Sequence, residues 1–316
     1  MRHILPLLLL AVAFVGCRAP DPPGARASAR TAEVLAASSE APHAAPPVVA
    51  PASEGASAKV TAVYPWRPTA TERLDVRFPA PDGFMRADAA EGTFAAFLRT
   101  LPLLPRGAKV VDYRGAPLYD DGRHPNIAAV VDIDVGHRDL QQCADAIIRL
   151  HAEWRYGRGD RDIAYRALSG TSIPYARYVA GERAVIRGND LVLARTGTAR
   201  TDEHALFRTY LDDVFQFAST RSLERDAVRV VFPGVLAGDF FVMTGQPFGH
   251  AVLILDVAKD ERGRLALLLG QSFMPAQSFQ ILQPDARSAW FVVEPGATEV
   301  KTPFWPAFST EMTRRL

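Results

Sequence analysis

The spacing of apolar residues predicts helices in the first half of the folded part of this chain and strands in the second. Residues 140–156 carry apolar side chains at helical intervals, and Asp139 in front of them is a good N-cap. Residues 251–258 are almost wholly apolar, which is typical of a strand covered on both faces, and residues 265–269 follow after a polar turn. The pattern predicts an α+β domain with helices packed on a mainly antiparallel sheet.

The first 17 residues have the pattern of an export signal. A positive start at Arg2 precedes an apolar stretch, which ends at a small residue and Cys17. This ending resembles a lipobox, which would make Cys17 the site of lipidation. Arg18 then favours the outer membrane, facing the periplasm. An ordinary signal peptide and an N-terminal membrane helix remain as alternatives, although the apolar run is shorter than the roughly 20 residues that span a bilayer.

Residues 18–62 are rich in Ala, Pro, Ser and Glu and almost lack large apolar side chains. Such a segment cannot bury enough surface to offset its loss of chain entropy, so we expect a disordered tether. Residues 63–316 then suit a single globular α+β domain.

Composition narrows the range of partners. Hydrophobic residues make up 48% of the chain, its net charge is +1, and no basic stripe is present. This argues against nucleic acid as a partner. No phosphate-binding glycine loop or other cofactor motif appears, so no cofactor is predicted.

The chain contains two cysteines, and lipidation of Cys17 would leave Cys143 without a disulfide partner. Cys143 lies in the first turns of the predicted helix, where free backbone N–H groups favour a thiolate. His250 begins the apolar strand. The two residues could form a nucleophile and its general base, with Gln271 orienting the imidazole.

Whether His250 and Gln271 can meet depends on the turn between their strands. A four-residue loop at 260–263 makes them same-face diagonal neighbours, and a two-residue loop sets them directly opposite each other. A loop of odd length places them on different faces.

Other residues could support this chemistry. Gln141, Gln142 or the Cys143 amide could bind the oxyanion. Asp239, after a glycine, is a turn or cap residue that could also bond the chain beside His250.

Alternatives remain for each of these residues. Cys143 shares a helical stripe with apolar residues and could simply pack in the core. His250 could be a structural histidine bonded to a carbonyl. Asp132 and Asp134 share one face of a predicted strand at 128–135 and could hold a hard cation, although such a face is more often solvated.

Several motifs together resemble the bacterial domain of unknown function 4846. They are residues 132–136 (DIDVG), 139–146 (DLQQCADA), 238–241 (GDFF), 249–251 (GHA) and 271–277 (QSFMPAQ). The similarity runs over most of residues 64–316. It implies export or lipid anchoring but no activity.

A second resemblance concerns layout. A cysteine, then a histidine that opens a strand after Gly-Asp, then a polar residue, is similar to NlpC-type cell-wall peptidases. This implies a papain-like fold and a cysteine hydrolase or acyltransferase that acts on amide or peptide bonds of the cell wall. The gap between Cys143 and His250 is long for that family, and Gln142 replaces the usual aspartate before the cysteine. The alternative is a non-catalytic envelope lipoprotein that binds a protein or glycan partner.

Overall fold

The computed structural model describes residues 64–66, 72–246 and 248–316. The chain divides into residues 1–58 and 59–316, and only the second unit contains described residues. The predicted signal peptide with Cys17 and the whole of the predicted tether at 18–62 therefore lie outside them. No helix within the described ranges has the length and apolar character to cross a membrane.

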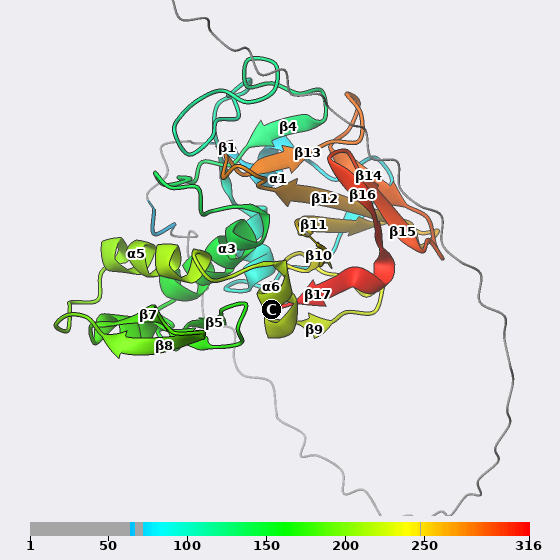
Figure 1. Ribbon diagram of the computed structural model, residues 1–316. Helices are drawn as coiled ribbons and strands as arrows, with labels where there is room; N and C mark the ends of the chain where they lie inside the picture. Colours follow the sequence, from blue (N-terminus) through cyan, green and yellow to red (C-terminus); the bar gives the residue numbers. More distant parts are fainter. Residues whose placement is uncertain (1–63, 67–71, 247) are drawn as a thin grey trace, which may run out of the picture. The chain divides into compact units, whose positions relative to one another are not determined.

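A nine-stranded antiparallel sheet forms the centre of the second unit (Figure 1). Its main path consists, in spatial order, of β4 (Ile127–Val130), β13 (Gln280–Leu282), β12 (Leu265–Gln271), β11 (His250–Lys259), β10 (Phe240–Met243), β17 (Thr313–Arg315) and β9 (Val228–Arg229). Two further strands pair off this path, β14 (Trp290–Val293) with β12 and β2 (Met85–Arg86) with β11.

The loop between β11 and β12 has an odd number of residues. Lys259 pairs with Leu265, so five residues, 260–264, form the turn. Continued without interruption, this register would put His250 and Gln271 on opposite faces of the sheet.

A β-bulge between Ile254 and Asp256 reverses that outcome. Beyond it Leu253 pairs with Gly270, which brings Gln271 onto the same face as His250. The buried Asp256 carboxylate accepts hydrogen bonds from Arg86 and Arg99, each at 2.7 Å. Two cations from β2 and the helix at 94–99 therefore hold the bulge in place.

The helices are α1 (Leu74–Arg77), α2 (Phe94–Arg99), α3 (Cys143–Gly157), α4 (Tyr175–Val179), α5 (His204–Phe215) and α6 (Thr220–Asp226), with a 3₁₀ turn η1 (Thr310–Met312). Only α3 is longer than 12 residues. It packs against β11, and most of its residues are buried. Asp139 does not cap it as predicted: the N-cap is Gln142, because the Asp139 carboxylate instead accepts the Ala276 N–H.

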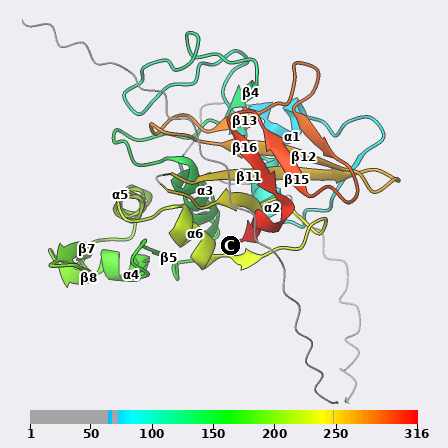
Figure 2. The ribbon, with the colours of Figure 1, turned by 45° about the vertical axis from the view of Figure 1, so that its right-hand side comes forward.

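The remaining strands form two-stranded pairs: β1 (Glu72–Arg73) with β3 (Pro102–Leu103), β5 (Ala164–Arg166) with β6 (Ser172–Pro174), β7 (Glu182–Arg187) with β8 (Asp190–Arg195), and β15 (Glu299–Thr302) with β16 (Trp305–Ser309). The β7–β8 hairpin lies beyond α4 and α5, away from the sheet (Figure 2). β15 and β16 contribute Val300 and Phe308 to an apolar cluster that is separate from the cluster formed with α3. The two clusters cover opposite faces of the sheet, since successive residues of β11 alternate between them.

The predicted fold class is wrong. The described part of the chain is mostly β, built on the nine-stranded sheet with few and short helices, and it is not a papain-like arrangement of helices on a sheet. Apolar spacing misled the prediction: the strand predicted at 128–135 ends at Val130, and residues 74–77 form the short helix α1. Strands of two or three residues, such as those of the β1–β3 and β5–β6 pairs, are too short to show an alternating pattern.

Candidate active site

His250 and Gln271 meet through a direct hydrogen bond. The first residue of β11 donates from its Nε2 to Oε1 of the last residue of β12 at 2.8 Å. Because an amide oxygen only accepts, this bond places the imidazole proton on Nε2 and leaves a lone pair on Nδ1. Nδ1 is buried and has no hydrogen-bond partner among the described residues. The sequence prediction that these two residues meet is thus matched by the geometry.

Aromatic side chains surround the imidazole. The rings of Trp305 and Phe273 each lie 4.9 Å from the His250 ring, centroid to centroid. Burial lowers the pKa of His250 to about 4, although the hydrogen bond that His250 donates to Gln271 acts in the opposite direction. The imidazole is therefore neutral at pH 7, which is the form that accepts a proton.

Cys143 is the first residue of α3 and is 5% exposed. The backbone N–H of Ala251, the residue that follows His250, acts to lower the pKa of the Cys143 thiol. Burial raises the pKa of the Cys143 thiol to about 11, and the negative charge of Asp145 adds to the increase. The free protein therefore holds a thiol at neutral pH, and not the thiolate that the helix start favours.

Cys143 also lines a cavity of about 880 Å³ between the start of α3, the start of α6 and the segment before β11. The wall includes Gly249 but not His250. No hydrogen bond within the described ranges joins the Cys143 sulfur to the imidazole. The structure thus bonds His250 to Gln271, and it brings Cys143 to the backbone immediately beside His250.

Gly249 allows this close approach of segments. A Cβ at this position would lie 2.4 Å from the Met243 carbonyl oxygen and 2.5 Å from Thr220 Oγ1. Both distances are far below van der Waals contact, so the loop before His250 and the first residue of α6 can meet only if this residue is glycine.

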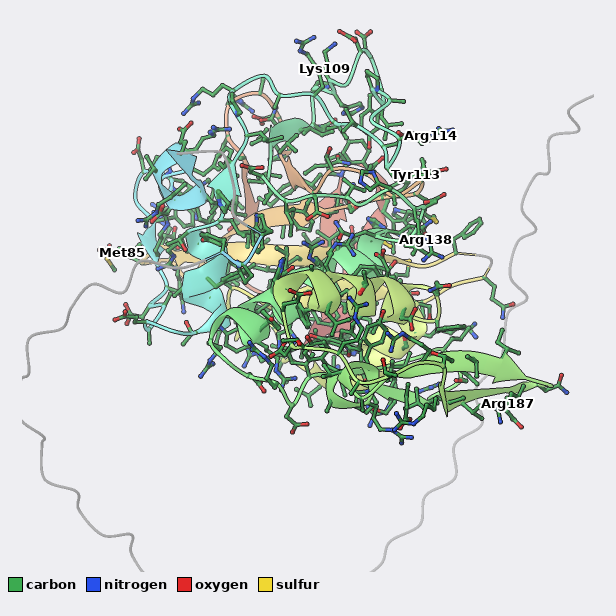
Figure 3. The ribbon with its side chains drawn as sticks, turned by 90° about the vertical axis from the view of Figure 1, so that its left-hand side faces the viewer. Met85, Lys109, Tyr113, Arg114, Arg138 and Arg187 are labelled. Carbon is green, nitrogen blue, oxygen red and sulfur yellow. The ribbon has the colours of Figure 1, made fainter. Side chains whose placement is uncertain are left out.

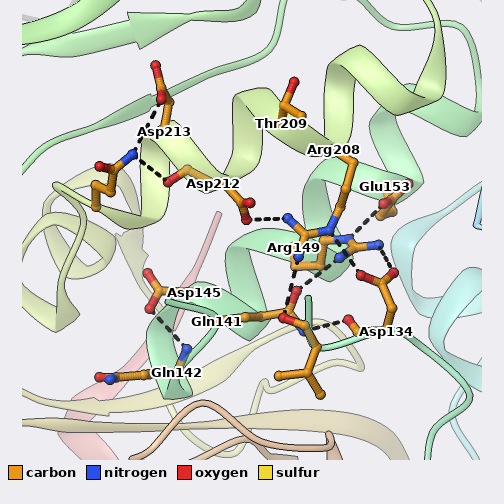
Figure 4. Close-up of polar contacts among 12 residues, drawn as sticks. Asp134, Gln141, Gln142, Asp145, Arg149, Glu153, Arg208, Thr209, Asp212 and Asp213 are labelled. Atoms are coloured by element: carbon orange, nitrogen blue, oxygen red, sulfur yellow. Dashed lines mark hydrogen bonds and ion pairs between the residues drawn. The ribbon is translucent and has the colours of Figure 1, made fainter. Parts of the chain in front are cut away.

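Gln141 is not available as an oxyanion donor. It is 1% exposed, its Nε2 donates to the Asp134 carbonyl oxygen, and its Oε1 accepts from Arg149 at 2.9 Å (Figure 4). Arg149, which is fully buried, also donates to Glu153 at 2.7 Å. The Gln141 carbonyl oxygen accepts from Ser272 Oγ at 3.2 Å, next to Gln271. Gln141 therefore ties the start of α3 to the end of β12.

The other predicted oxyanion donors remain at the cavity. Gln142 lines it and uses one Nε2 hydrogen to bond Asp139. The Cys143 amide lies in the first turn of α3, where N–H groups have no acceptor within the helix. Asp239 does not bond the chain beside His250: its carboxylate accepts from the Leu236 N–H and forms an ion pair with Arg315.

The rival cation site at Asp132 and Asp134 is not supported. Both residues follow the end of β4, so they do not share a strand face. Asp134 pairs with Arg149 at 2.8 Å and Arg208 at 3.1 Å. Although partial burial acts in the opposite direction, these guanidinium groups hold the pKa of Asp134 well below its usual range. The described residues contain no cluster of three metal-ligating side chains.

A second cavity, of about 890 Å³, lies beside this arginine network. Tyr113, Arg114 and Arg138 lie along its side of the molecule, far from Arg187 on the β7–β8 hairpin (Figure 3). Of its three arginines, Arg114 is paired with Asp112 and Arg208 with Asp134 and Asp212, whereas Arg138 forms no ion pair with a described residue.

Sequence reasoning missed three residues at the site. Trp305 covers His250 from β16, a strand too short to be assigned by pattern. Asp145 lines the cavity two residues after Cys143. Arg149 could have been noticed from the sequence, because it pairs with Glu153 at helical i,i+4 spacing on a helix that is otherwise apolar on that side.

Comparison with known proteins gives one match. The family model described as "Domain of unknown function (4846)" matches residues 74–315, which is more than half of the chain. No curated protein and no solved structure matches.

Proposed function

Since the chain belongs to the family of domain of unknown function 4846, whose name carries no activity, we propose its function from the site: a thiol-dependent hydrolase or acyltransferase that acts on amide or peptide bonds of the cell wall. Cys143 is the nucleophile, His250 the general base and acid, and Gln271 the residue that orients the imidazole.

The observation that carries this proposal is the state of His250. Its Nε2 is bonded to Gln271, its Nδ1 has no hydrogen-bond partner among the described residues, and the N–H of the next residue, Ala251, acts on the Cys143 thiol. A thiol at a helix start and a base fixed in one tautomer are two of the groups that nucleophilic catalysis needs. The two groups approach β11 from opposite faces of the sheet, so the proposal requires that their contact forms when substrate binds.

We propose the following proton movements in the substrate complex. Attack of the Cys143 sulfur on the acyl carbon transfers the thiol proton to His250 Nδ1, and the Cys143 N–H stabilises the oxyanion. When the tetrahedral intermediate collapses, His250 returns this proton to the departing amine and a thioester remains on Cys143. Water, or an acceptor amine, then gives a proton to His250 and attacks the thioester, which restores the thiol.

The pKa shifts indicate how the first step proceeds. With the thiol pKa raised to about 11 and that of His250 lowered to about 4, no thiolate–imidazolium pair exists beforehand. Proton transfer is therefore concerted with attack on the carbonyl, so that the negative charge forms on the oxyanion and not on a buried sulfur.

The cellular setting of the proposal comes from the N-terminal sequence. We propose that lipidation of Cys17 attaches the protein to the membrane, facing the periplasm from the outer membrane, with residues 18–62 as tether. Cell-wall peptides and glycans would then lie within reach of the cavity.

Mass spectrometry of purified protein with cell-wall fragments tests the enzymatic proposal. We expect cleaved or transferred products, and a thioester adduct on Cys143. Cys143→Ala should abolish both, and His250→Gln should lower the rate at least about 10²-fold. Cys17→Ser is the control, because it replaces the chain's other cysteine, which lies outside the site. Full turnover by Cys143→Ala would refute the proposal.

One observation favours a second function, non-catalytic binding of a protein or glycan in the same cavity. Cys143 is buried with a raised thiol pKa, and His250 does not line the cavity. In this case a strain with Cys143→Ala keeps the wild-type phenotype, whereas deletion of the gene loses it. A Cys143→Ala phenotype equal to that of the deletion excludes this alternative.

A further inference from the structure

One residue in the wall of the Cys143 cavity has a buried carboxylate oxygen without a hydrogen-bond partner among the described residues. Asp145, in the first turn of α3, lines this cavity and is 7% exposed. Its Oδ2 accepts the Gln142 N–H at 3.2 Å (Figure 4). Its Oδ1 is buried and has no hydrogen-bond partner within the described part of the chain.

Such an oxygen is unusual in a folded protein. Buried polar atoms nearly always have a partner, and a buried carboxylate without a cation is strongly disfavoured. Burial accordingly raises the pKa of Asp145 to about 7, despite the opposing bond from Gln142. The site lacks a positive charge that would stabilise the carboxylate.

The described residues do not supply this charge. The one basic side chain that the described residues contribute to the cavity wall is Arg221 on α6, which is exposed. No ion pair between Arg221 and Asp145 occurs among the described residues. A cation that reaches Asp145 must therefore come with a ligand in the cavity.

We propose that this cavity selects acyl substrates with a primary ammonium group beside the bond to be cut, and that Asp145 is the counter-ion of that group. The inference rests on the proposed thiol-dependent function and specifies its substrate class. Asp145 and Cys143 both line this cavity at the start of α3, so an ammonium group bound to Asp145 shares the cavity with the reacting carbonyl.

Binding of the ammonium group also assists the nucleophile. The negative charge of Asp145 contributes to the high pKa of the Cys143 thiol. A substrate ammonium group cancels this contribution as it binds, so the correct substrate makes the thiol easier to deprotonate. An N-acetylated analogue, which carries no charge, cannot do so.

The experiment compares matched peptide libraries by mass spectrometry. Tri- and tetrapeptides are supplied free, with an acetylated α-amino group, or with acetylated lysine side chains. These arms distinguish an N-terminal ammonium group from a side-chain one. The wild-type protein is measured beside Asp145→Asn, Arg221→Gln and Cys143→Ala. Asn at 145 keeps an acceptor for the Gln142 N–H.

We expect wild-type kcat/KM to fall at least about 10²-fold when the recognised amine is acetylated, since a buried carboxylate then loses its partner. The ratio of kcat/KM for the free peptide to that for the acetylated peptide should approach one in Asp145→Asn. In Arg221→Gln this ratio should match that of the wild type. Equal cleavage of free and acetylated peptides by the wild type overturns the inference and leaves the proposed hydrolase standing. Absence of any Cys143-dependent cleavage overturns the proposed function, and the inference with it.

Discussion

At Cys143 two effects on the thiol oppose each other. The N–H groups at the start of α3 lower its pKa, whereas burial and the nearby Asp145 carboxylate raise it. Burial is the larger effect, because the sulfur is shielded from water while the helix end contributes only partial charges. The same reasoning applies to His250, whose pKa burial lowers to about 4. At both residues the surroundings decide which protonation state is present.

Asp145→Asn tests the charge effect on the thiol. Removal of the carboxylate should lower the pKa of Cys143 from about 11, so that alkylation by iodoacetamide becomes faster at any fixed pH below that value. The rate is measured against pH. Asp285→Asn, in an exposed loop, serves as control. An unchanged or slower reaction of Asp145→Asn would contradict the assignment.

His250 should also make stability depend on pH. Its folded pKa of about 4 is below its ordinary value of 6.5, so between these values the unfolded chain binds a proton that the folded one does not. The free energy of unfolding therefore decreases as pH falls from 6.5 to about 4. Below about pH 4 both states bind the proton, so His250 causes no further decrease. Urea unfolding of His250→Gln should show a weaker decrease over this interval. An identical pH dependence in the two proteins would argue against a buried neutral imidazole.

Among the elements, the hairpin of β11 and β12 decides whether a site exists. Its five-residue loop alone would separate His250 from Gln271, and the bulge before Asp256 reunites them. Arg86 and Arg99 neutralise the buried Asp256 carboxylate within the bulge. A contact between two other elements and β11 thus sets the face on which the imidazole lies.

Asp256→Leu tests this dependence. It removes the partner of two partly buried arginines, and we expect the free energy of unfolding to fall by about 3 kcal/mol. The bulge should relax, and the Nε2 proton signal of His250 bonded to Gln271 should disappear from the NMR spectrum. Asp260→Leu, in the neighbouring turn, should preserve that signal. Its persistence in Asp256→Leu would show that the bulge has another cause.

Gly249→Ala tests the packing of the loop against α6. The added Cβ would lie within 2.5 Å of Met243 and Thr220 atoms, so we expect destabilisation of about 1–3 kcal/mol. Gly197→Ala is the matched control, because a Cβ there meets nothing within 4 Å. Thermal unfolding compares the two. Equal melting temperatures would show that the loop can move away at little cost.

On the scale of the whole molecule, the sheet separates two apolar clusters, and the site lies at the edge where β11 begins and β12 ends. α3 brings Cys143 to this edge from one face, and β16 brings Trp305 over His250 from the other. The N-terminal sequence predicts how this unit is presented to the cell wall.

Replacement of Cys17 tests that presentation. Cys17→Ser should lose the mass of the diacylglyceryl group and move from the membrane fraction to the soluble periplasmic fraction. Cys143→Ser should remain lipidated and membrane-bound. Intact mass and cell fractionation measure both properties. Membrane attachment of Cys17→Ser at the wild-type level would exclude the lipid anchor.

The sequence by itself determined the family, the order of Cys143, His250 and Gln271, and the existence of the buried strands and of α3, because local residue patterns encode these features. It led to a wrong fold class, since strands of two to four residues carry no readable periodicity. Only the tertiary structure decided that His250 bonds Gln271 and that Gln141 accepts a hydrogen bond from Arg149. It also decided that Asp145 Oδ1 has no hydrogen-bond partner among the described residues. Each depends on segments distant in the chain, whose packing sets register, burial and charge together.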